Sequence, residues 1–163
     1  MKWLIPRDDP TIPPDLTPPE EAIPALIAAG ANPALALAMF RFKWRMKQLG
    51  HTISFVQIWR SADTQAALYA RGRTTPGRIV TNAPPGHSPH ECMENGRPAS
   101  QAFDIAIREG KLLSWEVSDR TARFWSDARD TGRMCGLKWG GDLPAPPGDY
   151  GHFQLSTFTK VTK

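Results

Sequence analysis

The segment Gln101-Ala102-Phe103-Asp104-Ile105-Ala106-Ile107 has the strict alternation of a β-strand whose two faces differ in chemistry. Phe103, Ile105 and Ile107 share one face, which suits a hydrophobic core. The other face carries two alanines and one carboxylate, Asp104. Small neighbours leave room beside that carboxylate, as a strand that lines a metal site would need. We therefore expect this strand to contribute both to the core and to a functional site.

Helix signals surround this strand on both sides. Asn32 can cap a helix that starts at Pro33 and ends near Gly50, after about four turns. Ser61 can cap a helix over 62–70, Ser118 begins one that runs to about Met134, and a short helix from Pro18 through Ile27 precedes Gly30. Further strands are expected over 52–60, 79–80 and 152–155. The elements predict an α+β fold, with helices packed on a small central antiparallel sheet.

The helix expected over 33–49 is amphipathic. Leu35, Met39, Phe42 and Met46 fall on one face at helical spacing, while lysines and arginines occupy the rest. A basic amphipathic helix can bind a membrane surface, but the same pattern is more often a core helix with a solvated face. We favour the core interpretation and expect no stable insertion into a membrane.

The composition is that of one globular domain. The chain has 163 residues, of which 40% are hydrophobic and 22% charged, and its formal charge is +4. This charge suits an anionic partner such as nucleic acid, a membrane surface or a cell-wall polymer, although it could also be a merely soluble basic surface. No block of like charges marks a nucleic-acid footprint. We expect one domain over 1–163 that acts as a monomer, with residues 1–26 as a proline-rich N-terminal arm.

Three separated segments contain side chains that could bind one metal ion. They are Ser88-Pro89-His90, the strand residue Asp104, and Asp149-Tyr150-Gly151-His152. Two imidazoles and a carboxylate would give zinc three protein ligands and leave a position open for water, as in catalytic zinc sites. Asp149, three residues before His152, could then accept a proton from that water; the alternative is a turn aspartate that binds its own backbone.

Other interpretations of these residues stay open from residue types alone. His87, with His90 and Cys92, could chelate a metal locally, because zinc binds both His and Cys. Arg60, at the end of an expected strand, could hold a carboxylate or polarise a carbonyl. It could equally be a surface arginine.

At the level of whole motifs, residues 35–157 resemble the peptidoglycan L-alanyl-D-glutamate endopeptidases of bacteriophage lysis. These endolysins are similar to the zinc D-alanyl-D-alanine carboxypeptidases and belong with the VanY-like peptidases. The resemblance rests on motifs in the family's order: Trp59-Arg60-Ser61 with Gln65, Leu68-Tyr69-Ala70-Arg71-Gly72-Arg73-Thr74, Pro76-Gly77-Arg78-Ile79-Val80-Thr81-Asn82-Ala83, Gly86-x-Ser88-x-His90, Ala102-x-Asp104, Gly136-Leu137-x-Trp139-Gly140-Gly141-Asp142 and Asp149-x-x-His152-Phe153-Gln154.

The resemblance implies a Hedgehog/DD-peptidase-like zinc fold and one Zn²⁺ per chain. It places the zinc ligands on His90, Asp104 and His152, the catalytic carboxylate on Asp149 and the substrate-gripping arginine on Arg60. The remaining matches near the site, which the resemblance assigns to substrate binding, are Ser88 and Gln65.

The activity that the resemblance implies is zinc-dependent hydrolysis of the L-Ala–D-Glu bond in the peptidoglycan stem peptide, serving cell lysis. The alternatives are a D-alanyl-D-alanine carboxypeptidase and a non-catalytic, zinc-stabilised wall-binding protein. Nucleic acid is not expected as a partner, and no separate wall-binding domain is expected. Because residues 1–7 are too short an apolar run for a signal peptide, we expect synthesis in the bacterial cytoplasm and action on the wall after release.

Two departures from the family pattern accompany the resemblance. The connection between His90 and Asp104 is longer than usual and contains Asn95-Gly96, so we expect a protruding loop over 91–100. Leu143 stands where the family often has an aromatic residue, and prolines follow it. This second departure concerns the lip of the substrate cleft.

Overall fold

A five-stranded antiparallel sheet forms the centre of the computed structural model, which describes residues 18–143 and 148–162. The strand order is β1-β4-β7-β6, and β5 pairs with the far end of β4. The bounds are β1 Ile53–Gln57, β4 Ala102–Glu109, β5 Leu112–Ser114, β6 Leu137–Trp139 and β7 His152–Leu155. The strand expected around Asp104 is confirmed as β4, which lies between β1 and β7.

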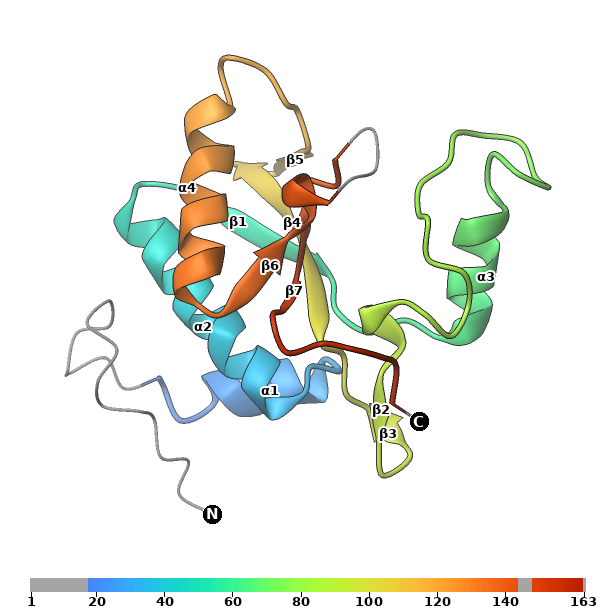
Figure 1. Cartoon of the computed structure of the whole chain (residues 1–163). Coiled ribbons are helices and arrows are strands. Elements are labelled where there is room, and N and C mark those ends of the chain that lie inside the picture. The colour runs from blue at the N-terminus through green and yellow to red at the C-terminus, as the bar shows by residue number, and fades with distance from the viewer. Residues whose placement is uncertain (1–17, 144–147, 163) are drawn as a thin grey trace.

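Four α-helices surround this sheet in the described residues, and the α+β prediction is confirmed. They are α1 Ala22–Ala28, α2 Pro33–Gln48, α3 Ala62–Ala70 and α4 Ala122–Met134, with short 3-10 helices η1 Pro89–Glu91 and η2 Gly140–Asp142. Helices α2 and α4 lie along one side of the sheet, whereas α3 and its loops stand apart from it on the other (Figure 1). We call residues 61–87 the α3 lobe. It lies on the opposite side of the sheet from α2 and α4 (Figure 1).

The core lies between α2 and the sheet. Phe42 of α2 packs against Phe103 and Phe153, with ring centroids 5.5 Å and 4.8 Å away. All three side chains are fully buried, as are Met39 and Met46 of the same helix. The prediction of a core helix in place of a membrane-surface helix is confirmed. No helix of the described chain is both long and apolar enough to cross a bilayer.

The capping residues act as predicted. The side chain of Asn32 accepts a hydrogen bond from the Leu35 amide at 2.7 Å. Ser61 accepts one from the Thr64 amide at 3.2 Å. These contacts satisfy backbone donors that would otherwise lack partners in the first turns of α2 and α3.

Three element predictions were wrong. Helix α4 begins at Ala122, because the segment from Ser118 to Thr121 forms a separate turn closed by a backbone hydrogen bond of 3.0 Å. Residues 79–80 form no strand; both side chains are exposed in a loop of the α3 lobe. Strand β1 ends at Gln57, after an irregularity in its pairing with β4, so residues 58–60 leave the sheet.

The insertion between His90 and Asp104 forms a hairpin of β2 (Met93–Glu94) and β3 (Arg97–Pro98). Asn95 and Gly96 both have positive φ, 51° and 73°, as a two-residue hairpin turn requires. The hairpin projects from the body of the protein, as predicted (Figure 1). The residues that flank the hairpin, Cys92 and Ala99, do not project and are buried in the protein.

Replacing residues 93–98 with a two-residue Asn-Gly turn is expected to preserve folding and metal binding. Cys92 and Ala99 are already adjacent, since the Ala99 amide donates to the Cys92 carbonyl at 2.9 Å. The variant loses two hydrogen bonds between Met93 and Thr162, each worth about 1 kcal/mol. Thermal unfolding and metal analysis check this. A folded variant without metal would show that the hairpin positions His90.

The proline-rich arm expected over 1–26 falls mostly outside the described residues. Its final part enters α1, and Ile23, Leu26 and Ile27 pack against the core. The short helix predicted through Ile27 is therefore present.

Candidate metal centre

Three side chains that are far apart in the sequence meet at one point. His90 comes from η1, Asp104 from β4 and His152 from the start of β7. The pairing of Asp104 with His152 across β4 and β7 brings two of them together, and the turn at η1 brings the third. Within the described part of the chain they are the one group of His, Cys, Asp and Glu residues placed to hold a metal ion.

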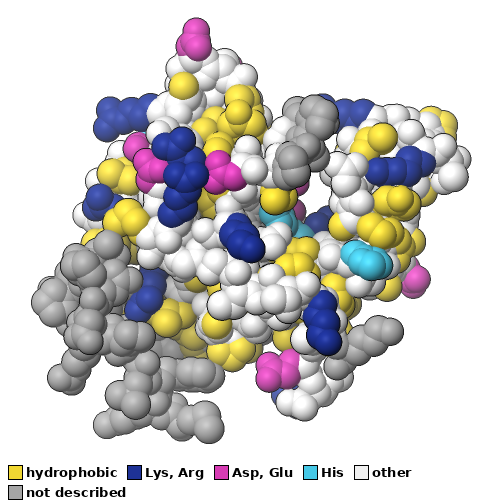
Figure 2. Space-filling model, viewed as in Figure 1, with side chains coloured by type: hydrophobic (Ala, Val, Ile, Leu, Met, Phe, Trp, Pro, Cys, Tyr) yellow, Lys and Arg dark blue, Asp and Glu magenta, His cyan; other side chains and the backbone are white. Residues whose placement is uncertain are grey.

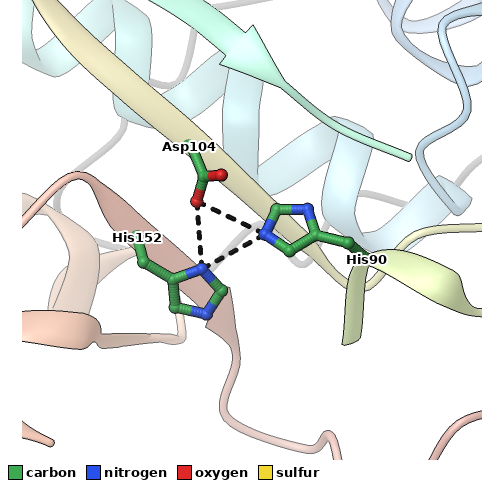
Figure 3. A group of neighbouring side chains, drawn as sticks. All are labelled: His90, Asp104 and His152. Carbon is green, nitrogen blue, oxygen red and sulfur yellow. Dashed lines mark hydrogen bonds and ion pairs between the residues drawn. The ribbon is translucent and has the colours of Figure 1, made fainter. Parts of the chain in front are cut away.

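The facing atoms lie at nearly equal distances (Figure 3). Asp104 Oδ1 is 3.0 Å from His152 Nδ1 and 3.3 Å from His90 Nε2, and the two nitrogens are 3.2 Å apart. Tetrahedral zinc at about 2.0–2.1 Å from each ligand would separate ligand atoms by about 3.3 Å. The observed triangle therefore fits one face of a zinc tetrahedron.

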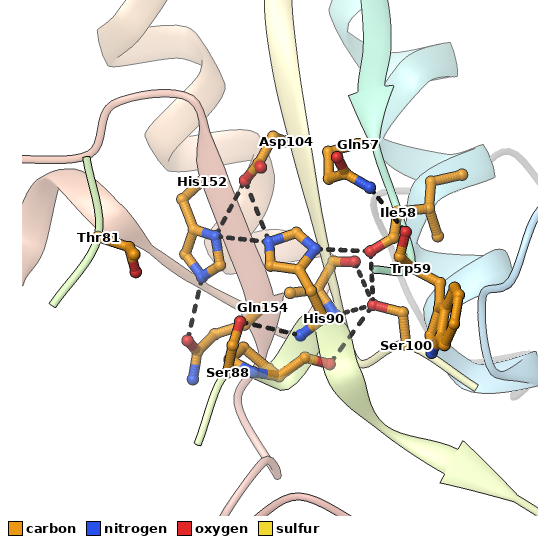
Figure 4. Close-up of polar contacts among 12 residues, drawn as sticks. Gln57, Ile58, Trp59, Thr81, Ser88, His90, Ser100, Asp104, His152 and Gln154 are labelled. Atoms are coloured by element: carbon orange, nitrogen blue, oxygen red, sulfur yellow. Dashed lines mark hydrogen bonds and ion pairs between the residues drawn. The ribbon is translucent and has the colours of Figure 1, made fainter. Parts of the chain in front are cut away.

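Each histidine is oriented by a hydrogen bond from its outer nitrogen (Figure 4). His90 Nδ1 donates to the carbonyl oxygen of Ile58 at 2.6 Å, and Ser100 Oγ donates to the same oxygen at 2.9 Å. His152 Nε2 lies 3.2 Å from Gln154 Oε1, to which it donates. Such outer contacts fix the tautomer and ring direction of metal-binding histidines.

These tautomers leave lone pairs pointing at one another. With protons on the outer nitrogens, His90 Nε2 and His152 Nδ1 both present lone pairs toward the Asp104 carboxylate. Three such acceptors within 3.3 Å repel one another unless positive charge lies between them. A metal cation meets this need, so the residues present fit zinc.

The pKa shifts also reflect the demand for positive charge. Burial raises the pKa of Asp104, but the charges and hydrogen bonds of His90 and His152 outweigh it and hold the pKa well below its usual range. Burial lowers the pKa of His152, yet the hydrogen bond and charge of Asp104 outweigh it and the net shift is upward. The site favours a charged carboxylate beside positive charge, whether an imidazolium or a metal cation carries that charge.

Asp149 is exposed, and its carbonyl accepts a hydrogen bond from the His152 amide at 3.1 Å, which holds the residue beside the centre. Desolvation by the surrounding protein, then the charge of Asp104, raises the pKa of its carboxyl despite the opposing cations. Gly140 allows this segment to pack closely against it. A Cβ at that position would clash with the Asp149 carbonyl oxygen and would lie 2.9 Å from His152 Cβ. This close approach explains the glycine in the Gly140-Gly141-Asp142 motif.

Arg60 lies beside the same centre. Its amide donates to the His90 carbonyl at 3.1 Å, which ties the residue to the segment that carries His90. Burial lowers the pKa of the guanidinium, while the charges of Asp104, Asp149 and Glu91 oppose that shift. Among the described residues, its buried Nε has no hydrogen-bond partner. The surroundings suit a guanidinium that reserves donors for a ligand, in contrast to a solvated surface arginine.

Ser88 and Gln65 are both buried, so neither presents its side chain to solvent. Ser88 caps η1 in a capping box with Glu91. Gln65 Nε2 donates to the Ala83 carbonyl at 2.6 Å and holds the loop of the α3 lobe on that helix. Figure 2 shows histidine atoms at the base of the hollow between this lobe and the sheet.

His87 and Cys92 do not belong to the centre in the described structure: His87 is exposed, and Cys92 is buried as a free thiol. We therefore expect His87→Ala and Cys92→Ser to bind one metal per chain, like the parent protein. Metal analysis of purified variants checks this. Stoichiometric loss of metal from either variant would support the alternative of a local metal site formed by His87, His90 and Cys92.

Some contributors to the centre were not assigned from the sequence. The Ile58 carbonyl belongs to the backbone and has no residue-type signature. Ser100 lies in a loop, where a hydroxyl is ordinary. Gln154 could have been found, because it shares a strand face with His152.

Comparison with known proteins identifies peptidoglycan endopeptidases to which the chain is similar. No protein-family model matches the chain. It is 28% identical over 112 residues to "Peptidoglycan L-alanyl-D-glutamate endopeptidase CwlK" of Bacillus subtilis (strain 168); the match covers 65% of this chain but only 62% of that relative. The fold is similar to the crystal structure of Serratia marcescens L-Ala D-Glu endopeptidase ChiX, with a TM-score of 0.50 and 22% identity over 83% of this chain and 84% of that one. The chain is thus similar in sequence to one protein named as a peptidoglycan L-alanyl-D-glutamate endopeptidase and similar in fold to another.

Proposed function

We propose that this protein is a zinc-dependent endopeptidase that cuts the L-Ala–D-Glu bond of the peptidoglycan stem peptide. The observation that carries this proposal is the triangle of His90, Asp104 and His152, whose facing atoms lie 3.0–3.3 Å apart. The bond is taken from the names of the two similar proteins, which both state it. The proposal extends it to this chain.

His90, Asp104 and His152 would hold one zinc ion per chain and leave its fourth position open. Bound zinc supplies Lewis acidity and lowers the pKa of a bound water to about 7. The ligands cannot also act as the general base, because their inward-facing atoms are engaged with the metal. A separate proton acceptor is needed nearby.

Asp149 meets that need. Its carboxylate takes the proton of the attacking water and delivers it to the nitrogen of the leaving D-Glu residue. An upward-shifted pKa assists the delivery, since the carboxyl then holds the proton more readily than a free aspartate would. The exposed position of Asp149 next to His152 gives the carboxylate access to substrate.

Arg60 would hold a substrate oxygen. Its partly desolvated guanidinium lies in the field of Asp104 and Asp149, where it stays charged and can grip a carboxylate or carbonyl oxygen. Ser88 and Gln65 are buried, so we assign them an indirect part in substrate binding. They would position the loops that border the hollow.

The bacterial wall is also a suitable partner for the charge of the protein. The formal charge of +4 favours approach to an anionic polymer. We propose that the protein acts on the wall after its release from the cytoplasm, as a lytic enzyme. Oligomerisation is not needed, because one chain supplies every residue of the centre.

Digestion of purified peptidoglycan, followed by mass spectrometry of the products, tests the proposed function. A new N-terminal D-Glu is expected. Release of D-Ala in its place would indicate the carboxypeptidase, and binding without cleavage would indicate a non-catalytic wall protein. A His152→Ala variant treated in parallel controls for contaminating hydrolases.

A further inference from the structure

An exposed tryptophan lies beside the candidate metal centre and has no part in the mechanism above. Trp115 follows β5 and exposes 52% of its surface. Its indole lies against Gly151: a Cβ on that glycine would be 3.5 Å from Trp115 Cδ1 and 3.7 Å from Nε1. Since consecutive Cα atoms are 3.8 Å apart, the indole reaches within about 9 Å of the His152 Cα.

A pocket of about 390 Å³ lies along the same segment. The aromatic residues Trp125, Trp139 and Tyr150 contribute to its wall, and Ser118 and Asp119 are among the polar residues that line it. Tyr150 directly precedes Gly151, and Val117 and Ser118 follow Trp115 by two and three residues, so the chain links the pocket wall to the indole at two points. The connection from β5 to α4, which carries Trp115 and Ser118, rises above the end of the sheet where β7 begins (Figure 1).

The chemistry of this surface suits a sugar. A pyranose ring has an apolar C–H face and a rim of hydroxyl groups, which an aromatic face and neighbouring polar side chains can match. In peptidoglycan the L-Ala of the stem is joined through a lactyl group to an N-acetylated amino sugar. That sugar is therefore the next group beyond the L-Ala residue of the scissile bond.

Resting on the proposed function, we infer that Trp115 and the adjoining pocket bind the N-acetylmuramyl group that carries the stem peptide. The indole supplies the apolar face, and the pocket beyond Tyr150 receives polar substituents of the sugar. Stem peptides still attached to the glycan are then better substrates than free peptides. Trp115 is a specificity residue in this arrangement and takes no part in bond cleavage.

Two synthetic substrates with the same peptide test this inference. One is an N-acetylmuramyl tripeptide that begins with L-Ala–D-Glu, and the other carries a simple N-acetyl group in place of the sugar. The parent protein is expected to show a higher kcat/KM on the muramyl substrate. Trp115→Ala should lower that value about tenfold and leave the N-acetyl peptide unaffected. Trp115→Phe, which keeps an aromatic face, should restore most of the preference.

Leu112→Ala is the matched control, because Leu112 precedes the same connection and is 71% exposed. It should change neither value. An equal fall on both substrates in Trp115→Ala would mean that the indole only supports Gly151, and an unchanged ratio would mean that it does not meet the sugar; either result overturns the inference. If the parent protein cleaves neither substrate, the proposed function itself fails and the subsite fails with it.

Discussion

Replacing His152 with alanine should abolish both zinc binding and hydrolysis. The substitution removes one of three ligand atoms and leaves His90 and Asp104 facing a void. Even loss of an outer partner of a metal ligand lowers affinity by about 10–100-fold, so loss of the ligand itself must cost more. Metal content after dialysis and turnover on peptidoglycan are the two measurements. Both should fall to background.

Gln154→Ala provides the matched comparison. It removes the acceptor that orients His152 Nε2 but keeps all three ligands. We expect zinc affinity to fall by about 10–100-fold while saturating zinc restores turnover. A His152→Ala protein that retained stoichiometric zinc would show that the metal is bound elsewhere.

Asp149→Asn should separate proton transfer from metal binding. Asp149 is not one of the three side chains whose ligand atoms converge, so the variant is expected to keep one zinc per chain. The amide has nearly the shape of the carboxylate but cannot accept the proton, and general-base catalysis contributes about 10²–10⁴-fold. We expect kcat to fall by that factor with little change in metal content. Near parental turnover would remove Asp149 from the mechanism.

Local chemistry explains which parts of the fold could be predicted from the sequence. Asn32 and Ser61 predicted the starts of their helices, because a capping side chain binds a backbone amide only three residues away. The strand around Asp104 was evident because each face repeats every second residue. By contrast, β5 and β6 are three residues long, too short for a period, and depend on pairing with distant strands.

The candidate site also combines features that local sequence predicts with features that depend on distant contacts. His90, Asp104 and His152 were identified by residue type and by resemblance, but their convergence depends on β4 pairing with β7 and on the turn at η1. The Ile58 carbonyl that orients His90 was not predictable, since every residue has such a group. Trp115 was missed because its position over Gly151 arises from tertiary structure alone.

Titration of the metal-free protein with zinc tests the central claim most directly. Chelator-treated protein would receive increasing zinc while release of the peptide with a new N-terminal D-Glu is followed by mass spectrometry. The proposed mechanism predicts no product without metal and full activity at one equivalent per chain, with no recovery in His152→Ala. Full hydrolysis by the metal-free protein would contradict it.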